Sequence, residues 1–187
     1  MYCINSLAIR SNKMDKERKT IHSWKNISLI EEFVPLPNGK NIRHTSISHP
    51  GAAVILPITE EGEIVLIKQF RPSLKKWFLE LPAGTLEPNE SVLSCAKREL
   101  QEETGYCADT MISMGQVTPL AGFCDEIQHL FIAKDLTSTQ CLTCDDDEVI
   151  EVVLMDINTI EQKIVSGEVS DAKTIACLSK AKLSGHI

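Results

Sequence analysis

The stretch LPAGTLEPNESVLSCAKRELQEETGY, residues 81–106, joins a loop that contains proline and glycine to a helical pattern. Apolar side chains recur at helical spacing between residues 90 and 104 and share one side of the predicted helix: Val92, Leu93, Ala96 and Leu100. Asn89 is a candidate N-cap and Gly105 a candidate C′ residue, so both ends carry a signal. The sequence therefore predicts a helix of about four turns directly after a bent loop.

Three carboxylates lie close together on this predicted helix. Glu99, Glu102 and Glu103 are spaced i, i+3 and i+4, so they project from one arc of about 100°. Glu99 and Glu103 are about 6 Å apart along the helix axis, a gap that side chains can close around a divalent cation. An all-oxygen site suits Mg²⁺ or Mn²⁺. The alternative is a solvated acidic face, salt-bridged to Lys97 and Arg98.

The flanking sequence predicts more strands than helices. The first stretch of about 20 residues is polar and is expected to fray. The predicted strands are a hairpin over residues 24–47 with its turn at Asn38–Gly39, then residues 52–58, 63–69, 111–117, 128–133 and 149–155. The runs 52–58 and 63–69 are expected at the centre of a sheet. Helices are expected at residues 158–165 and 170–183, the second with Ser170 as N-cap.

Strands and helices mix without strict βαβ alternation. This order predicts an α/β (α+β) fold in which a mixed sheet packs between helices, with the N-terminal hairpin as an appendage.

The residue types from Gly84 to Tyr106 follow the pattern G-x5-E-x7-R-E-L-x-E-E-x-G-Y. This pattern resembles the Nudix box at every defined position over its 23 residues. The resemblance implies a Nudix-like mixed sheet between helices and an enzyme that hydrolyses a nucleoside diphosphate derivative with a divalent cation. It also implies that Arg98 and Glu90 form a pair that braces the loop against the helix. The cation site is therefore preferred to the solvated face.

The same resemblance gives roles to four residues. Glu99 and Glu103 match the main metal ligands of the family, and Glu102 matches a further ligand or a catalytic group that orients water. The carbonyl of Ala83 matches a main-chain ligand. The expected cofactor is Mg²⁺, with Mn²⁺ as a substitute. Such ions neutralise diphosphate oxygens and lower the pKa of a bound water, which can then attack phosphorus.

The flanks of the box resemble the ADP-ribose pyrophosphatase branch. The matching segments are KQFR at 68–71, WFLELPAG at 77–84 and GEVSDAKT at 167–174, and the similarity runs from about Trp24 to Leu183. The resemblance implies hydrolysis of ADP-ribose or another ADP-sugar to AMP and a sugar phosphate. It also implies that Arg71 contacts phosphate, where its planar fork can bridge two oxygens. A surface arginine after a strand is the alternative.

In this branch the N-terminal strands form a homodimer and stack aromatic groups on adenine across the subunit boundary. Trp24 lies where such a group is expected, and His44 is a second candidate for the opposite face. The alternative is that Trp24 is an ordinary core residue. The resemblance thus divides the chain into an N-terminal region, residues 1–50, for dimerisation and base contacts, and a catalytic domain, residues 51–187.

The general base has two candidates. Glu148 is preferred, because the acidic run DDDE at 145–148 lies where the branch has a mobile catalytic loop, and Glu126 is its rival. A plain solvated loop is the alternative for the first. The chain departs from the branch at Ala121–Gly122, where Pro-Gly is usual, and this departure bears on the substrate. GDP-mannose, NADH, dinucleoside polyphosphates and a nucleotide-sensing module with little turnover therefore stay open as alternatives.

Composition excludes several other classes. With 19 basic and 26 acidic residues the net charge is -7, which disfavours partners such as nucleic acid or an anionic membrane. No apolar run reaches membrane-spanning length and the N-terminus lacks a signal core, so a cytoplasmic location is expected. Seven cysteines at irregular spacing do not form a disulfide framework. Cys141 and Cys144 form one CxxC without a second pair, which disfavours structural zinc.

Overall fold

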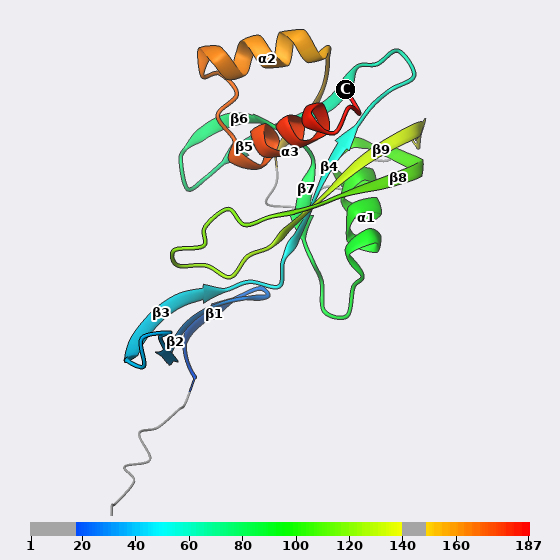
Figure 1. The fold of residues 1–187 in the computed structure, drawn as a ribbon. Helices are drawn as coiled ribbons and strands as arrows, with labels where there is room; N and C mark the ends of the chain where they lie inside the picture. The colour runs from blue at the N-terminus through cyan, green and yellow to red at the C-terminus, as the bar shows by residue number, and fades with distance from the viewer. Residues whose placement is uncertain (1–17, 140–148) are drawn as a thin grey trace, which may run out of the picture.

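The computed structural model describes residues 18–139 and 149–187. Within these ranges the chain forms ten strands and three helices (Figure 1). The strands are β1 (Lys19–Trp24), β2 (Ile27–Pro35), β3 (Asn41–Ser48), β4 (Ala52–Pro57), β5 (Ile64–Arg71), β6 (Lys76–Glu80), β7 (Ala83–Thr85), β8 (Tyr106–Val117), β9 (Gln128–Ser138) and β10 (Ile150–Met155). The helices are α1 (Val92–Thr104), α2 (Ile157–Ser166) and α3 (Ala172–Leu183). None of these helices is long and apolar enough to cross a membrane.

The N-terminal strands form a sheet of their own. β1, β2 and β3 pair in chain order and antiparallel, and the predicted turn at Asn38–Gly39 joins β2 to β3, with Gly39 at φ 80°. This sheet lies at the opposite end of the molecule from α2 (Figure 1). All of β1 is exposed and Ile30 is the one buried residue of β2. β1 was not predicted, because its sequence KTIHSW is too polar to stand out as a strand.

The remaining strands divide into two sheets. A mixed four-stranded sheet has the order β7-β4-β9-β8, in which β4 and β9 are parallel, and an antiparallel sheet has the order β10-β5-β6. β4 and β5 are inner strands, as predicted, but of different sheets, and an isolated bridge between Ile58 and Ile64 links them. The predicted fold class, a mixed sheet between helices with an N-terminal strand appendage, is confirmed.

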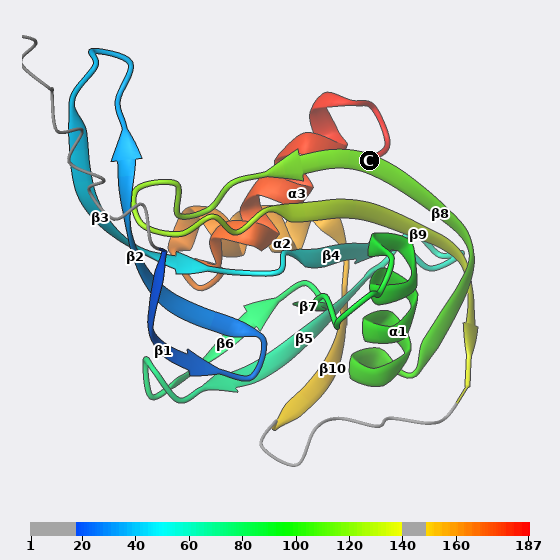
Figure 2. The ribbon, with the colours of Figure 1, turned by 90° about the horizontal axis from the view of Figure 1, so that it is seen from below.

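Two apolar clusters hold these layers together. On one face of the mixed sheet, Ala53 and Ile55 pack with Ala96 and Leu100 of α1. On the other face, a larger cluster joins β4 and β9 to β5, α2 and α3, through residues such as Leu66. Figure 2 shows α1 on one side of β4 and α3 on the other. The mixed sheet is thus covered by helices on both faces, and the box helix is one of those covers.

Helix α1 begins two residues later than predicted. Its N-cap is Ser91, whose hydroxyl accepts from the N–H of Ser94 at 3.1 Å, whereas Asn89 is in a left-handed conformation at φ 65°. Gly105 is the C-cap at φ 71°, as predicted. Leu93 is 45% exposed, so the apolar stripe is narrower than its pattern suggested.

The last helix also has a different cap. Asp171, not Ser170, caps α3, because its carboxylate accepts from the N–H of Thr174 at 2.9 Å. Asp and Ser are both good caps, so their neighbouring positions left the choice open in the sequence.

Candidate active site

Gly84 in β7 lies against the carboxylate of Glu99 in α1. A Cβ on Gly84 would lie 1.9 Å from Cδ and 1.9 Å from Oε1 of Glu99, so any other residue at this position would displace that carboxylate. The glycine of the box is therefore required by close approach and not by an unusual backbone angle. A short loop joins β7 to α1, and the carboxylate of Glu99 packs against the β7 backbone just before that loop.

Glu103, one turn further along α1, also faces β7. Its side chain is buried, at 2% exposed, and its Oε2 accepts a hydrogen bond from the N–H of Ala83 at 2.8 Å. Two of the predicted metal ligands thus lie on successive residues of β7: Glu99 on Gly84 and Glu103 on Ala83. The third, Glu102, is more open, with 37% of its side chain exposed.

Arg98 braces the loop against the helix, as predicted. Its Nε and Nη2 donate to the two carboxylate oxygens of Glu90 at 2.8 and 2.9 Å, and Nη2 also donates to the carbonyl of Thr85 at 3.3 Å. The hydrogen bonds from Arg98 lower the pKa of Glu90 to about 2. Glu90 in turn raises the pKa of Arg98, so the pair is ionised throughout the physiological range.

Arg98 also pairs with two of the predicted metal ligands. Its Nη1 donates to Glu99 Oε1 at 2.7 Å and to Glu102 Oε2 at 2.9 Å. The salt bridges of the alternative reading are therefore present, but Lys97 has no part in them and the burial of Glu103 does not fit a solvated face. One guanidinium occupies the place where two carboxylates converge.

The donor set fits a hard divalent cation, although the side chains are not gathered around one point. Within residues 18–139 and 149–187, no three acidic, histidine or cysteine side chains form a ready cluster of metal-binding size. The carboxylates are bound to other groups instead: Glu99 and Glu102 accept from Arg98, and Glu103 accepts from the N–H of Ala83. All three carboxylates project from one arc of one helix, so holding an ion would require their side chains to rotate toward one point.

Arg71 ends β5 and is bound to Glu80. Its Nε donates to Glu80 Oε1 at 2.9 Å and its Nη2 to Oε2 at 2.6 Å, while about a third of its side chain stays exposed. The hydrogen bonds to Glu80 raise the pKa of Arg71 against the opposing effect of burial, and the charges of Glu80, Glu103 and Asp171 add to the rise. Arg71 is therefore a fixed cation within electrostatic range of the box helix, not a loose surface arginine.

Of the two candidates for the general base, only Glu126 lies within the described residues. Glu148 lies outside the described residues, as does the Cys141/Cys144 pair. Glu126 accepts a hydrogen bond from Nε2 of Gln128 at 3.0 Å. The carbonyl of the next residue, Ile127, accepts from the N–H of Ala52 at 3.0 Å and would lie 3.3 Å from a Cβ on Gly51, whose other close neighbour is Leu86 of the box loop.

The segment that carries Glu126 is attached to the N-terminal sheet. The N–H of Ile47 in β3 donates to the carbonyl of Phe123 at 2.7 Å, and the N–H of Asp125 donates back to Ile47 at 3.1 Å. Asp125 also accepts from the N–H of His49 at 2.6 Å. These bonds connect the appendage to the box domain beside Glu126.

Trp24 is a surface residue and not part of the core. It is 43% exposed, and its ring stacks on His22 with centroids 5.8 Å apart. His22 was missed in the sequence, although a spacing of two residues in a strand places both rings on one face. His44 pairs with Glu32 in the middle of the β2–β3 hairpin, whereas Trp24 is paired at the β1–β2 turn. Within one chain, Trp24 and His44 are therefore not placed to contact the two sides of one bound base.

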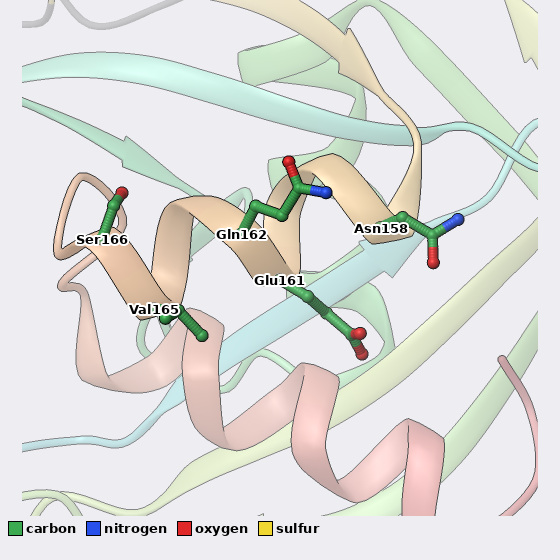
Figure 3. A pocket seen from close by; sticks show the side chains of 5 residues that line it. All are labelled: Asn158, Glu161, Gln162, Val165 and Ser166. Atoms are coloured by element: carbon green, nitrogen blue, oxygen red, sulfur yellow. The ribbon is translucent and has the colours of Figure 1, made fainter.

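A cavity of about 470 Å³ lies between the appendage and the box. It is lined by Asn26, which is in the turn after Trp24, by Pro50 and by residues 86–90 of the loop before α1. Small-molecule sites commonly have volumes of about 300–1,000 Å³. A second cavity of about 400 Å³ runs along α2 (Figure 3), but its five lining side chains all come from that helix and point in different directions. None of them belongs to the box, so this cavity is not assigned to the site.

Comparison with known proteins agrees with this geometry. The NUDIX domain model matches residues 48–176. The chain is 39% identical to the ADP-ribose pyrophosphatase of Bacillus subtilis, with 89% of this chain and 90% of that protein covered. It is 35% identical to the methanol dehydrogenase activator of Bacillus methanolicus, covering 87% and 89%. It is 33% identical to a GDP-mannose pyrophosphatase of Yersinia enterocolitica, covering 95% of each.

A crystal structure of an ADP compounds hydrolase has the same fold, with a TM-score of 0.77 at 20% identity over 91% of this chain and 93% of the other. Because the family model spans the strands, the loop and the helix that bring Gly84, Glu99 and Glu103 together, the chain belongs to the NUDIX domain family and is a Nudix-type enzyme, as the box predicted.

Proposed function

We propose that the protein hydrolyses the diphosphate bond of ADP-ribose or a related ADP-sugar, giving AMP and a sugar phosphate, with Mg²⁺ as the cofactor. The observation that carries the chemistry is the close approach of Glu99 to Gly84, with Glu103 bound to the adjacent residue of β7. The substrate class is supported by the 39% identity to a bacterial ADP-ribose pyrophosphatase over most of both chains.

Glu99 and Glu103, with Glu102 and the carbonyl of Ala83, are the residues that would hold Mg²⁺, or Mn²⁺ in its place. When bound, the divalent ion supplies charge neutralisation for the diphosphate and lowers the pKa of the attacking water. Glu99 and Glu102 would have to give up their contacts with Arg98 to hold the ion. Arg98 binds Glu90 through its other two nitrogens, so it could still hold the loop.

Two other groups act on the substrate and the water in this proposal. Arg71 binds a phosphate oxygen in this proposal. Glu80 holds Nε and Nη2 of the guanidinium, and neither of these two hydrogen bonds uses Nη1. Glu148 is the proposed general base and Glu126 its rival. Rates of Glu148→Gln and Glu126→Gln decide between them, since the base is the residue whose loss removes most of kcat near neutral pH.

The nucleoside is proposed to bind near Trp24, which is 43% exposed; the cavity of about 470 Å³ is lined by Asn26, two residues further on, and by the box loop. In a homodimer formed through residues 1–50, His44 of the partner subunit would supply the opposite face of the base. The exposed apolar side chains of the N-terminal sheet, among them Phe33 at 41% and Ile42 at 39%, support such an interface. Residues 51–187 would then form the catalytic domain.

A second substrate class has specific support. The GDP-mannose pyrophosphatase relative is 33% identical over 95% of both chains, so GDP-mannose is the alternative to ADP-ribose. A nucleotide-sensing module with little turnover is disfavoured, because Glu99, Glu102 and Glu103 are all present. We place the enzyme in the cytosol, in keeping with the four described cysteines, all free thiols, and with a net charge of -7 that suits neither nucleic acid nor an anionic membrane as partner.

A substrate panel tests the proposal. ADP-ribose, ADP-glucose, GDP-mannose, NADH and diadenosine polyphosphates are compared with Mg²⁺ by initial rates, and the products are identified. We expect the highest kcat/KM on ADP-ribose or ADP-glucose, with AMP as a product. A preference of about tenfold or more for GDP-mannose or a dinucleoside polyphosphate would contradict the substrate assignment, since that ratio is a difference of about 1.4 kcal/mol in transition-state binding.

A further inference from the structure

The N-terminal turn of α3 reaches the strand that leads into the box. Thr174 is completely buried, and its Oγ1 accepts a hydrogen bond from the N–H of Leu81 at 2.8 Å. The same hydroxyl donates to Oδ2 of Asp171, the N-cap of the helix, at 2.6 Å. Leu81 lies two residues before Ala83, whose N–H binds Glu103. The backbone just before the two residues that contact Glu99 and Glu103 is therefore held by α3, which lies on the opposite side of β4 from α1 (Figure 2).

Lys173, in the same turn, binds the carboxylate that holds Arg71. Its Nζ pairs with Oε2 of Glu80 and lies 3.2 Å from Oδ1 of Asp171. Glu80 is 1% exposed, so this carboxylate is a buried junction between two cations, Arg71 and Lys173. Burial alone would raise the pKa of Glu80, but the hydrogen bond from Arg71 and the charge of Lys173 hold it below its usual value.

The charges at this junction balance only when all four groups are counted. Arg71, Glu80 and Lys173 carry one net positive charge, and Asp171, 3.2 Å from Lys173, brings the network to neutrality. A buried ion pair is weak evidence of stabilisation, because desolvation offsets most of its attraction and apolar side chains would pack as well. Lys173 shares the negative charge of Glu80 with Arg71, so the network holds a partly exposed arginine in place without Glu80 neutralising it alone, which suits the binding of an anion.

We propose that Lys173 and Thr174 are positioning residues of the active site: Thr174 sets the backbone before the box, and Lys173, through Glu80, sets Arg71 for the diphosphate. The two side chains with their shared partner Asp171 are called the α3 clamp. This inference rests on the proposed function, because it gives the segment SDAKT, residues 170–174, a task in the same reaction. Neither side chain is expected to touch the reacting atoms.

Lys173→Met and Thr174→Val test the two arms separately, with Lys173→Arg and Thr174→Ser as conservative variants. Lys182→Met is the matched control, since Lys182 is also an ion-paired lysine of α3 but binds Glu161 of α2. Each protein is assayed for KM and kcat with ADP-ribose, for affinity toward ADP by calorimetry, and for Mn²⁺ affinity by electron paramagnetic resonance. Thermal melting shows that each variant is folded at the assay temperature.

The two arms should give different signatures. Lys173→Met should raise KM and the Kd for ADP by about tenfold and leave Mn²⁺ affinity unchanged, because Arg71 contacts the substrate and not the ion. Thr174→Val should lower kcat and weaken Mn²⁺ binding by about fivefold or more, because the backbone under Glu99 and Glu103 loses its anchor. Lys173→Arg and Thr174→Ser should recover most of each loss, and Lys182→Met should match the wild type in all three assays.

Folded variants with wild-type KM, kcat, ADP affinity and Mn²⁺ affinity would overturn the α3 clamp, since a purely structural role changes only the melting temperature. Glu80→Gln separates the charge of the network from its geometry. It increases the positive charge around Arg71 but weakens the contacts that hold Arg71 in place. Tighter ADP binding would mean that charge alone matters, and would also overturn the positioning role of Lys173. A wild type without activity on ADP-ribose contradicts the proposed function only, because the ADP and Mn²⁺ comparisons still decide whether the clamp exists.

Discussion

Replacing Gly84 by alanine should separate the activity of this protein from its stability. A Cβ at residue 84 would lie 1.9 Å from Cδ and Oε1 of Glu99, whereas ordinary van der Waals contact begins at 3.4 Å. The carboxylate of Glu99 must therefore retreat by about 1.5 Å. Gly84 is not among the glycines at positive φ, so alanine adds no backbone strain. The whole perturbation falls on one proposed metal ligand.

The fold should tolerate this retreat, because the displaced atoms are the end of a flexible side chain. An off-rotamer side chain costs about 0.5–1.5 kcal/mol. The reduced freedom of the unfolded chain offsets this by about 0.4–1 kcal/mol when glycine becomes alanine. We therefore expect the free energy of unfolding to change by less than about 1 kcal/mol. Turnover should fall about 100-fold, because a displacement of about 1 Å in an active site costs a factor of that order.

Urea unfolding measures the stability, initial rates with Mg²⁺ measure kcat/KM, and Mn²⁺ titration measures cation affinity. Gly122→Ala is the matched control for the stability measurement, since its Cβ would meet nothing within 4 Å and its φ is not positive. The reasoning is refuted if Gly84→Ala keeps kcat/KM within about threefold of wild type with unaltered Mn²⁺ affinity. A loss of several kcal/mol of stability would refute it equally, because the strain would then lie in the fold.

Three further predictions concern single residues. Glu103→Gln keeps an oxygen that can accept from the N–H of Ala83, so the variant should melt near the wild-type temperature while kcat falls by about two or more orders of magnitude; full activity would exclude Glu103 as a ligand. Glu90 has a pKa of about 2 against 4.5 for a free carboxyl, so its pair with Arg98 should stabilise the fold above pH 4.5 and lose that effect as the pH falls toward 2. Urea midpoints between pH 2 and 6 should show this slope in the wild type and a flatter one in Glu90→Gln, and equal slopes would contradict it. Trp24→Ala should raise KM for ADP-ribose about tenfold with little change in kcat, as expected when a base loses a stacking partner, and an unchanged KM would remove Trp24 from the substrate site.

The ends of α1 show how far local sequence predicts structure. Gly105 is the C-cap as predicted, because only the local need for a left-handed residue is involved. At the other end, Asn89 and Ser91 are both good N-cap residues. The choice between them depends on the contact between Glu90 and Arg98, which are eight positions apart. Arg98 binds Glu90 through two hydrogen bonds, and Glu90 also accepts from the N–H of Glu87, so residues 87–90 are held as a loop. The helix then begins at the next residue that can cap it.

The appendage was less predictable than the box. β1 is short, polar and wholly exposed, so no burial pattern marks it in the sequence. The exposure of Trp24 likewise depends on where its sheet lies and not on its neighbours in the chain. Its stacking on His22 is local and could have been anticipated from the alternation of strand side chains.

The box predicts the metal site but not the residues that recognise the substrate, and this difference has a structural cause. Gly84, Glu90 and Arg98 belong to a strand, a loop and a helix that follow one another in the chain and fold together, so their contacts leave a pattern of fixed spacing. Arg71 and Glu80, in contrast, meet Lys173 from the far end of the chain, and Lys173 is 93 positions after Glu80 in the sequence. No periodicity predicts that meeting. If the α3 clamp orients Arg71 as proposed, recognition of the substrate depends on contacts between distant elements, whereas the metal chemistry is encoded in one continuous stretch. Nudix enzymes could then change substrate through residues outside the box while the reaction at Glu99 and Glu103 stays the same.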